Sequence, residues 1–449
     1  MESRPEKSIL ILLTNSFAAI NLIHSGLLKQ LADRFEIQLS TNLIDEKEME
    51  HLNAHFEMKI QLAHIQVNSP SWLYRLLRIV QKFAFAQHFN IRTEMIKIGW
   101  PVTFSGWLFR RFPVINLFLL KIIRKYLITR STNLKPTCRS DFAGVISTSP
   151  FDFRENQIVN VFRQCGVKSL AIIVSWDNLT SKGVMNADHE VVLVWNQFMV
   201  EEFQRFYQIY GFPSKVLATG IPRFDIYSRL ESKLAAKHFR ERLLLSEDEK
   251  IILFTTGATK HFVDQTYVVQ DLLDYCQSCE QATLWIKCHP ADSVAHYRRF
   301  AENKRVKIWC DDSGEKSLSR WLPPINFPDS LAALIHSCNV CVQAASTIRI
   351  DAAACNKPVI SIYYDYKPGL AYKKSVRRLY DYSHQAPLNA LGLDRFVTDK
   401  HSLFHALDEL LSQPPNQVKY ALNIQPFTHF TEPNAVKCSV DHIAEWLGC

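Results

Sequence analysis

The sequence predicts an α/β protein with two doubly wound, Rossmann-like domains that face each other across a cleft. Continuously apolar runs, which are typical of parallel strands covered on both faces, alternate with amphipathic helical segments. This alternation stops in a highly charged stretch, residues 229–250, and then starts again. The chain of 449 residues is also longer than one hydrophobic core usually organises.

The first half begins with a strand, a helix and a second strand within residues 8–41. A later helix closes at Gly166 and another ends at Gly211, where glycine suits the left-handed backbone of a helix end. Further strands are expected within 142–150, 168–178, 190–195 and 214–225. In the second half, strands are expected within 250–259, 282–292, 305–309, 340–347 and 358–365, and helices within 264–280, 330–339 and 347–356.

The change in pattern sets the expected domain boundaries. Residues 1–235 form the first domain, which we expect to bind the acceptor of the reaction inferred below. Residues 236–430 form the second domain, which we expect to bind a nucleotide donor. A last helix, within residues 431–449, follows the cap-like Thr431-Glu432-Pro433 and is expected to pack back on the first domain.

Net charge and cysteine content limit the possible partners, compartment and metal sites. The net charge of +8 favours anionic partners, but the basic residues alternate with large aliphatic ones and no nucleic-acid-binding module is present, so we expect no nucleic acid partner. The 11 cysteines show no disulfide framework, which indicates a reduced, cytoplasmic protein. Two CxxC pairs, Cys276/Cys279 and Cys338/Cys341, are read as packing cysteines rather than zinc ligands, so no metal site is expected.

Residues 71–135 depart from the α/β pattern. Aromatic, aliphatic and basic residues mix there with almost no acids. As helices, these stretches have an apolar face bordered by Arg and Lys, which suits peripheral contact with the inner face of a membrane. They are equally consistent with core helices that have solvated basic edges. No apolar run is long enough to span a membrane, and the run of residues 9–13 is too short for the core of a signal peptide.

Polar side chains gather at the predicted carboxyl ends of the strands, where open α/β sheets bind their ligands. In the first half these are Thr14, Asn15, Ser16 and nearby His24; Ser147, Thr148, Ser149 and Asp152; and Ser175, Asp177, Asn178, Thr180 and Lys182. In the second half they are Thr255, Thr256, Gly257, Thr259 and Lys260; His289 and Asp292; and Ser346, Thr347 and Arg349.

The second-half residues suggest an anion site. Ser346 and Thr347 open a helix after a strand, and Asp351 follows one turn later, where it would meet a ribose hydroxyl. His289 follows a buried strand and precedes a proline, so it is a candidate donor to a phosphate or, less often, a base. Alternatively, Ser346 is only a helix cap and His289 is structural. The Gly257 turn is not a Walker loop, and the chain contains no GxGxxG, HExxH or GxSxG motif.

Together these residues resemble a GT-B fold glycosyltransferase. The order "TTGAT", "KCHP" and "STIRIDAAACNKPVISI" resembles the donor domain of that superfamily, and residues 194–225 resemble the segment that closes its first domain. The nearest resemblance is to the CDP-glycerol glycerophosphotransferase-like and the capsule or surface-polysaccharide transferases. "SWDNLTSKG" resembles a segment of polysaccharide-cluster proteins of this type. Asp351 stands where the superfamily usually has Glu, and Asn356 stands where Gly often precedes "KPV".

The resemblance implies roles for these residues. The donor would be a nucleotide-activated sugar, with no other cofactor. Gly257, Thr259, Lys260, His289, Ser346 and Thr347 would bind the donor, chiefly its phosphates, and Asp351 would contact its ribose. The acceptor would be a surface glycan or a lipid-linked hydroxyl.

In the first domain, Asp177 and His24 are the candidate bases for an inverting, metal-independent transfer. Asn178 and Lys182 would position the acceptor or a phosphate. The alternatives for Asp177 are that it positions substrate or only forms an Asx turn with Thr180 or Ser181.

Three other reactions or roles stay open. A polyol-phosphate transferase of the CDP-glycerol type, or a UDP-sugar 2-epimerase, would use the same fold. A non-catalytic binding protein is the third alternative, and released nucleotide would separate the transferases from the other two.

Overall fold

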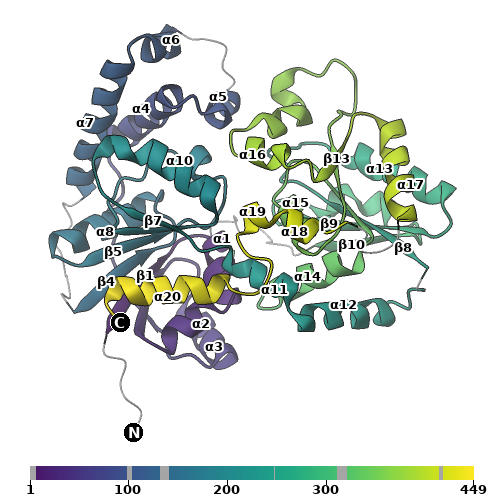
Figure 1. The fold of residues 1–449 in the computed structure, drawn as a ribbon, viewed down its shortest axis with the longest axis horizontal. Coiled ribbons are helices and arrows are strands. Elements are labelled where there is room, and N and C mark those ends of the chain that lie inside the picture. The colour runs from purple at the N-terminus through teal and green to yellow at the C-terminus, as the bar shows by residue number, and fades with distance from the viewer. Residues whose placement is uncertain (1–6, 99–103, 132–140, 247, 311–320, 414–417) are drawn as a thin grey trace. The chain divides into compact units, whose positions relative to one another are not determined.

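The computed structural model describes residues 7–98, 104–131, 141–246, 248–310, 321–413 and 418–449. It divides into two compact units (Figure 1). The first contains the described residues of Met1–Arg223, Ser319–Leu322 and Asn434–Cys449, and the second contains those of Phe224–Leu318 and Pro323–Pro433. Each unit is a parallel sheet with helices, which confirms the predicted fold class of two doubly wound domains.

The first unit is built on a seven-stranded sheet of order β3-β2-β1-β4-β5-β6-β7, in which all pairs are parallel. Ile11 in β1 lies between Leu39 of β2 and Ile146 of β4. The bounds are β1 (Ser8–Leu13), β2 (Glu36–Thr41), β3 (Gln61–Leu62), β4 (Phe142–Ser147), β5 (Lys168–Ile172), β6 (Val191–Val194) and β7 (Lys215–Ala218).

The helices of the first unit follow these strands, and polar caps fix several of their starts. Asp45 and Glu48 form a capping box at α3, and Asn196 accepts from the Met199 N–H at α10. The helices are α1 (Ser16–Ala19), the π-helix η1 (Ile20–His24), α2 (Leu27–Ala32), α3 (Glu46–Phe56), α4 (Trp72–His88), α5 (Arg92–Ile98), α6 (Phe104–Arg111), α7 (Pro113–Ser131), α8 (Phe153–Gln164), α9 (Asn178–Ser181), α10 (Gln197–Tyr207), the 3-10 helix η2 (Gln208–Tyr210) and α20 (Ala435–Leu447).

The second unit has a six-stranded sheet of order β10-β9-β8-β11-β12-β13, also parallel throughout. Its strands are β8 (Lys250–Thr255), β9 (Ala282–Cys288), β10 (Val306–Cys310), β11 (Val340–Gln343), β12 (Val359–Ile362) and β13 (Asp394–Val397). Its helices are α11 (Asp225–Ser228), α12 (Leu230–Arg242), α13 (Thr266–Ser278), α14 (Phe327–Ser337), α15 (Ile348–Ala354), α16 (Gln385–Ala390), α17 (Lys400–Ser412), α18 (Tyr420–Asn423) and α19 (Gln425–Thr428). The chain passes into this unit at Arg223/Phe224, ahead of the boundary predicted after residue 235.

The C-terminal helix α20 packs on α2, within the first unit. Lys7 Nζ donates to the carbonyl of Leu447, and Lys215 Nζ lies 2.9 Å from the Glu445 carboxylate. A Cβ placed on Gly144 would lie 2.4 Å from the Trp446 ring, so β4 has no room for a side chain where the helix crosses it. The close fit shows that α20 is an integral layer of this unit.

Four helices, α4 to α7, make up the described part of the basic region. Tyr74 of α4 packs with Ile123 and Leu127 of α7 in a buried cluster. Buried polar contacts add to this, because Asn116 Nδ2 donates to the carbonyl of Ala84 at 3.0 Å. One face of the region is therefore a core, while other side chains of the same helices stay exposed. Among the described residues, no helix combines the length and apolar character needed to cross a membrane.

A buried carboxylate, Glu155, fixes the loops that follow β1 and β4. Its side chain is 0% exposed. Oε1 accepts from the Thr14 hydroxyl at 2.6 Å, and Oε2 accepts from the Ser147 hydroxyl at 2.6 Å and the Ser149 N–H at 2.7 Å. Burial raises the pKa of Glu155 to about 7, although these three hydrogen bonds act to lower it.

Glu155→Gln is expected to remove a pH dependence of stability. Because the folded-state pKa is raised, the contribution of Glu155 is fully present below about pH 4.5 and is lost as pH rises through about 7. Between about pH 5 and pH 8, wild type should lose on the order of 2 kcal/mol of unfolding free energy relative to the Gln variant. Urea denaturation of both proteins at the two pH values measures this difference, and parallel losses would contradict it.

Candidate functional site

The topology of each sheet marks one place for a ligand. In both units the chain order reverses between two central strands, β1 and β4 in the first and β8 and β11 in the second. Loops leave such neighbouring strands in opposite directions, so their carboxyl ends border a crevice. The polar residues predicted after β1, β4, β8 and β11 lie at these positions, and those predicted after β5 and β9 follow the neighbouring strands. Each unit is considered separately below.

In the second unit, the loops after β8 and β9 are joined through His289. The His289 N–H donates to the Thr256 hydroxyl at 2.9 Å, and His289 Nδ1 accepts from the Ala291 N–H at 2.9 Å. Burial lowers the pKa of His289 to about 4, so the ring is neutral at pH 7. Since Nδ1 is an acceptor, the ring proton sits on Nε2. His289 therefore offers an N–H donor, which suits a phosphate oxygen better than proton abstraction.

The Gly257 turn lies beside His289 and is held by a single side chain. Gln265 accepts from the Gly257 N–H at 2.6 Å and donates to its carbonyl at 2.9 Å. The Thr259 hydroxyl donates to the carbonyl of Ala291, two residues after the histidine, at 3.2 Å. Lys260 is exposed at the end of the turn. The structure thus brings Gly257, Thr259 and His289 into one loop cluster.

The loop after β11 is shaped by buried amides that the sequence analysis did not single out. Ala345 has a left-handed backbone, with φ of +47°, which is strained for a residue with a side chain. Gln385 donates to its carbonyl at 2.9 Å, and Gln343 accepts from the Ser346 N–H at 2.7 Å. A polar residue in an apolar strand, as Gln343 is in "VCVQAA", is the signal that marks this anchor.

Ser346 and Thr347 lie at the start of the short helix α15, and Arg349 and Asp351 point into the unit. Arg349 is buried and donates to Gln385, Asn389 and Asp394. Asp351 is 2% exposed, and its carboxylate accepts from the hydroxyl of Tyr227, a residue of α11. The structure therefore leaves Ser346 and Thr347 near the loop surface and places Asp351 inside. A ribose contact by Asp351 stays a prediction.

In the first unit, "SWDNLTSKG" forms a tight turn around Asp177. Its carboxylate accepts from the hydroxyls of Ser175 and Ser181, both at 2.5 Å, and from Asn178 Nδ2 at 3.2 Å. Asn178 is buried, whereas Lys182 is exposed. The segment thus presents a half-buried carboxylate with its own hydrogen bonds, an arrangement that fits either a positioned base or a structural turn.

The charge of Asp177 acts on two charged residues of helices that are distant in sequence. The pKa of Glu202, on α10, is raised to about 7, chiefly by burial; Arg205 acts to lower it and Asp177 to raise it. Burial lowers the pKa of Lys97, on α5, against the opposing effects of Glu94 and Asp177. Neither residue was predicted, because nothing in the spacing of the sequence connects them to residue 177.

The remaining first-unit candidates lie along the loop after β1. His24 ends η1 half-buried, with Nδ1 3.1 Å from the carbonyl of Ala19. Asn15 caps α1 by accepting from the Ala18 N–H at 3.0 Å, and its amide donates to the Ser149 hydroxyl. In the described parts of the chain, no group of three or more His, Cys, Asp and Glu is arranged to hold a metal ion.

Solved structures similar to this chain share its two-domain architecture. A UDP-GlcNAc 2-epimerase from Neisseria meningitidis, bound to UDP-GlcNAc, has a TM-score of 0.56 at 12% identity, covering 98% of this chain and all of that one. A putative UDP-N-acetylglucosamine 2-epimerase from Listeria monocytogenes has 0.57 at 11% (99% and 97% covered). A glycosyltransferase from Rickettsia africae has 0.51 at 11% (98% of each). At these identities the similarity shows the fold alone.

No curated protein sequence matches the chain. A sequence model of one family does match, over residues 172–444, and its description is CDP-glycerol:poly(glycerophosphate) glycerophosphotransferase. The matched range is more than half of the chain, and it includes the Asp177 turn, the His289 loop and the Ser346 loop. The chain is therefore a transferase of the GT-B fold and belongs to the CDP-glycerol:poly(glycerophosphate) glycerophosphotransferase family.

Proposed function

We propose that this chain transfers a polyol phosphate from a CDP-activated donor to a hydroxyl of a glycan or lipid-linked acceptor. The observation that carries the proposal is the family match over residues 172–444, which contains the whole sheet of the second unit. In this reaction the acceptor oxygen attacks the phosphorus that bears the polyol. A new P–O bond forms, the bond to the bridging oxygen breaks, and CMP leaves.

A second candidate is transfer of a sugar from a nucleotide-sugar donor, with inversion. The fold is shared with a protein whose structure contains UDP-GlcNAc, and the strand-end loops resemble those of glycosyltransferases. Here the acceptor oxygen would attack the anomeric carbon, and a nucleoside diphosphate would leave. The two candidates use the same loops but release different nucleotides.

Donor binding is assigned to the second unit. The Nε2–H of His289 would donate to a donor phosphate beside the Gly257 turn, which Gln265 holds in place. Thr259 and exposed Lys260 extend this surface, and Ser346 and Thr347 offer hydroxyls from the β11 loop. A neutral histidine donor and a lysine would stabilise the leaving phosphate without a metal ion.

Acceptor activation is assigned to the first unit. Asp177 would accept the proton of the attacking hydroxyl, held in place by Ser175 and Ser181. Asn178 and Lys182 would position the acceptor from the same turn. His24, which ends η1, is the alternative base.

We also propose that the first unit lies on the inner face of the membrane, as a peripheral protein of the cytoplasm. Residues 71–131 contain eleven Lys and Arg but a single acid, Glu94. Apolar side chains on α4 and α7 are exposed in the same region, including Ile79 at 68% and Phe118 at 65%. Exposed apolar residues beside basic ones match an anionic lipid surface.

The released nucleotide tests the donor assignment. With acceptor membranes and CDP-glycerol, we expect CMP release, and a nucleoside diphosphate released from a nucleotide sugar would favour the second candidate instead. His289→Ala should weaken donor binding and lower the rate by roughly tenfold to a hundredfold, since a hydrogen bond to a charged group is lost. His401→Ala, an exposed histidine of α17, is the control. EDTA should leave the rate unchanged, and no nucleotide release from any donor would contradict the proposal.

Asp177→Asn tests whether Asp177 is the catalytic base or only a structural residue of the turn. The amide keeps the size of the side chain but cannot accept the proton, so kcat should fall about 10²- to 10⁴-fold with little change in the thermal midpoint. Ser181→Ala is the matched control, because it removes a hydrogen bond of the turn and leaves the carboxylate in place. Equal and small losses of activity in the two variants, together with lowered midpoints, would assign Asp177 a structural role.

Vesicle sedimentation tests the membrane contact. Ile79→Glu and Phe118→Glu should each weaken binding to vesicles that contain anionic lipid by roughly tenfold or more, because each removes apolar burial and adds a repelled charge. Val263→Glu, at an equally exposed apolar position of the second unit, should bind as wild type does. Binding should also weaken at high salt. Unchanged binding of the two α4 and α7 variants would refute the contact.

A further inference from the structure

A small, partly open cavity lies in the first unit, away from the strand ends that carry the proposed site. It is bordered by α7, by the segment that leads into β6, and by the turn between α10 and β7. Its volume is about 10 Å³, which is about the space that a single water molecule needs. Its polar lining comes from Arg124, Asp188, His189, Tyr207, Tyr210 and Ser214.

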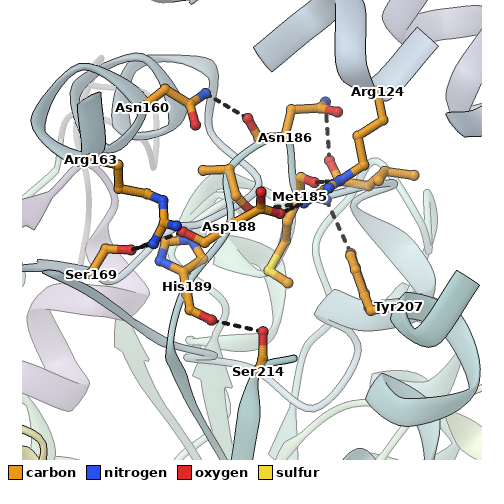
Figure 2. Close-up of polar contacts among 12 residues, drawn as sticks. Arg124, Asn160, Arg163, Ser169, Met185, Asn186, Asp188, His189, Tyr207 and Ser214 are labelled. Carbon is orange, nitrogen blue, oxygen red and sulfur yellow. Dashed lines mark hydrogen bonds and ion pairs between the residues drawn. The ribbon is translucent and has the colours of Figure 1, made fainter. Parts of the chain in front are cut away.

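The charged groups around the cavity are already paired (Figure 2). Arg124 donates to the Asp188 carboxylate at 2.5 Å and to the carbonyl of Met185 at 3.0 Å. Arg163 donates to Glu190 at 2.5 Å on the other side of the histidine. With one carboxylate for each guanidinium, the surroundings have no excess charge to attract an ion. The cavity therefore suits a neutral, polar occupant.

His189 is the unusual member of this lining. Its side chain is 1% exposed, and neither ring nitrogen has a hydrogen-bond partner among the residues that the structure describes. The hydroxyl of Tyr210 is also buried without such a partner in the described chain. Burial lowers the pKa of His189 to about 3, with smaller effects from Arg163 and Arg124, so the ring is neutral and has one donor and one acceptor.

Such groups are rarely left unsatisfied in a folded protein. A buried polar atom without a partner costs about 1–3 kcal/mol, and buried waters typically make about three hydrogen bonds to groups of this kind. We propose that the cavity binds one internal water molecule, which hydrogen-bonds a ring nitrogen of His189 and the hydroxyl of Tyr210. Arg124 joins α7 to the segment before β6 through its hydrogen bonds to Met185 and Asp188, and the water adds to these polar contacts.

The sign of a stability change distinguishes a hydrated cavity from a dry one. Leucine has nearly the size of histidine but no polar atoms. If the water is bound, His189→Leu removes one of its hydrogen-bond partners and disturbs its contact with the Tyr210 hydroxyl. The thermal midpoint should then fall by about 2–4 °C. If the cavity is dry, removing two unsatisfied nitrogens should raise the midpoint, which would overturn the proposal.

A double-mutant cycle shows whether one molecule joins the two residues. Among the described residues, neither the His189 ring nor the Tyr210 hydroxyl has a hydrogen-bond partner, yet a bridging water would make the effects of His189→Leu and Tyr210→Phe non-additive. His88→Leu is the matched control, since His88 also has a buried unpartnered nitrogen but does not line the cavity. It should combine additively with Tyr210→Phe. Additive effects in both pairs would refute a shared water.

A crystal structure of the wild-type protein provides the direct observation, independent of whether the variants fold. Density for one water within hydrogen-bond distance of a His189 ring nitrogen and of the Tyr210 hydroxyl is the expected result. A cavity without density, or density that requires a larger molecule or an ion, would overturn the proposal.

Discussion

Parallel pairing of strands is the constraint on which the rest of this structure depends. When every strand of a sheet runs in one direction, all carboxyl ends lie on one edge, and the loops that leave that edge determine what the unit can bind. Both sheets reverse their order next to the first strand, at β1/β4 and β8/β11. The two halves of the chain thus place their polar loops by the same rule, although their loop sequences differ.

The loops at these positions are fixed from beneath by buried polar side chains. In the first unit a single carboxylate, Glu155, hydrogen-bonds residues at the ends of both β1 and β4. In the second unit the same task is shared by neutral amides, Gln265 below the Gly257 turn and Gln385 below Ala345. An ionisable anchor responds to pH and an amide does not, so the two units hold equivalent loops by different chemistry.

Local pattern was enough to predict the family and the strands other than β3 and β13, with their polar ends, because buried parallel strands have continuous apolar runs and the loops after them have recognisable residues. The contacts that define each site were not predictable. The Tyr227 hydroxyl donates to Asp351, and the charge of Asp177 acts on Lys97 and Glu202, across separations along the chain that no periodicity encodes. The interior position of Asp351 follows from such a contact. The turn around Asp177 was foreseen as an alternative because all its donors lie within a few residues.

The path of the chain has a consequence for how the protein is made. The first unit includes α20, whose sequence follows that of the entire second unit. During synthesis from the N-terminus, the whole second unit is therefore translated before the helix that packs on Gly144 of the first. The unit whose translation begins first is the last to receive all of its elements.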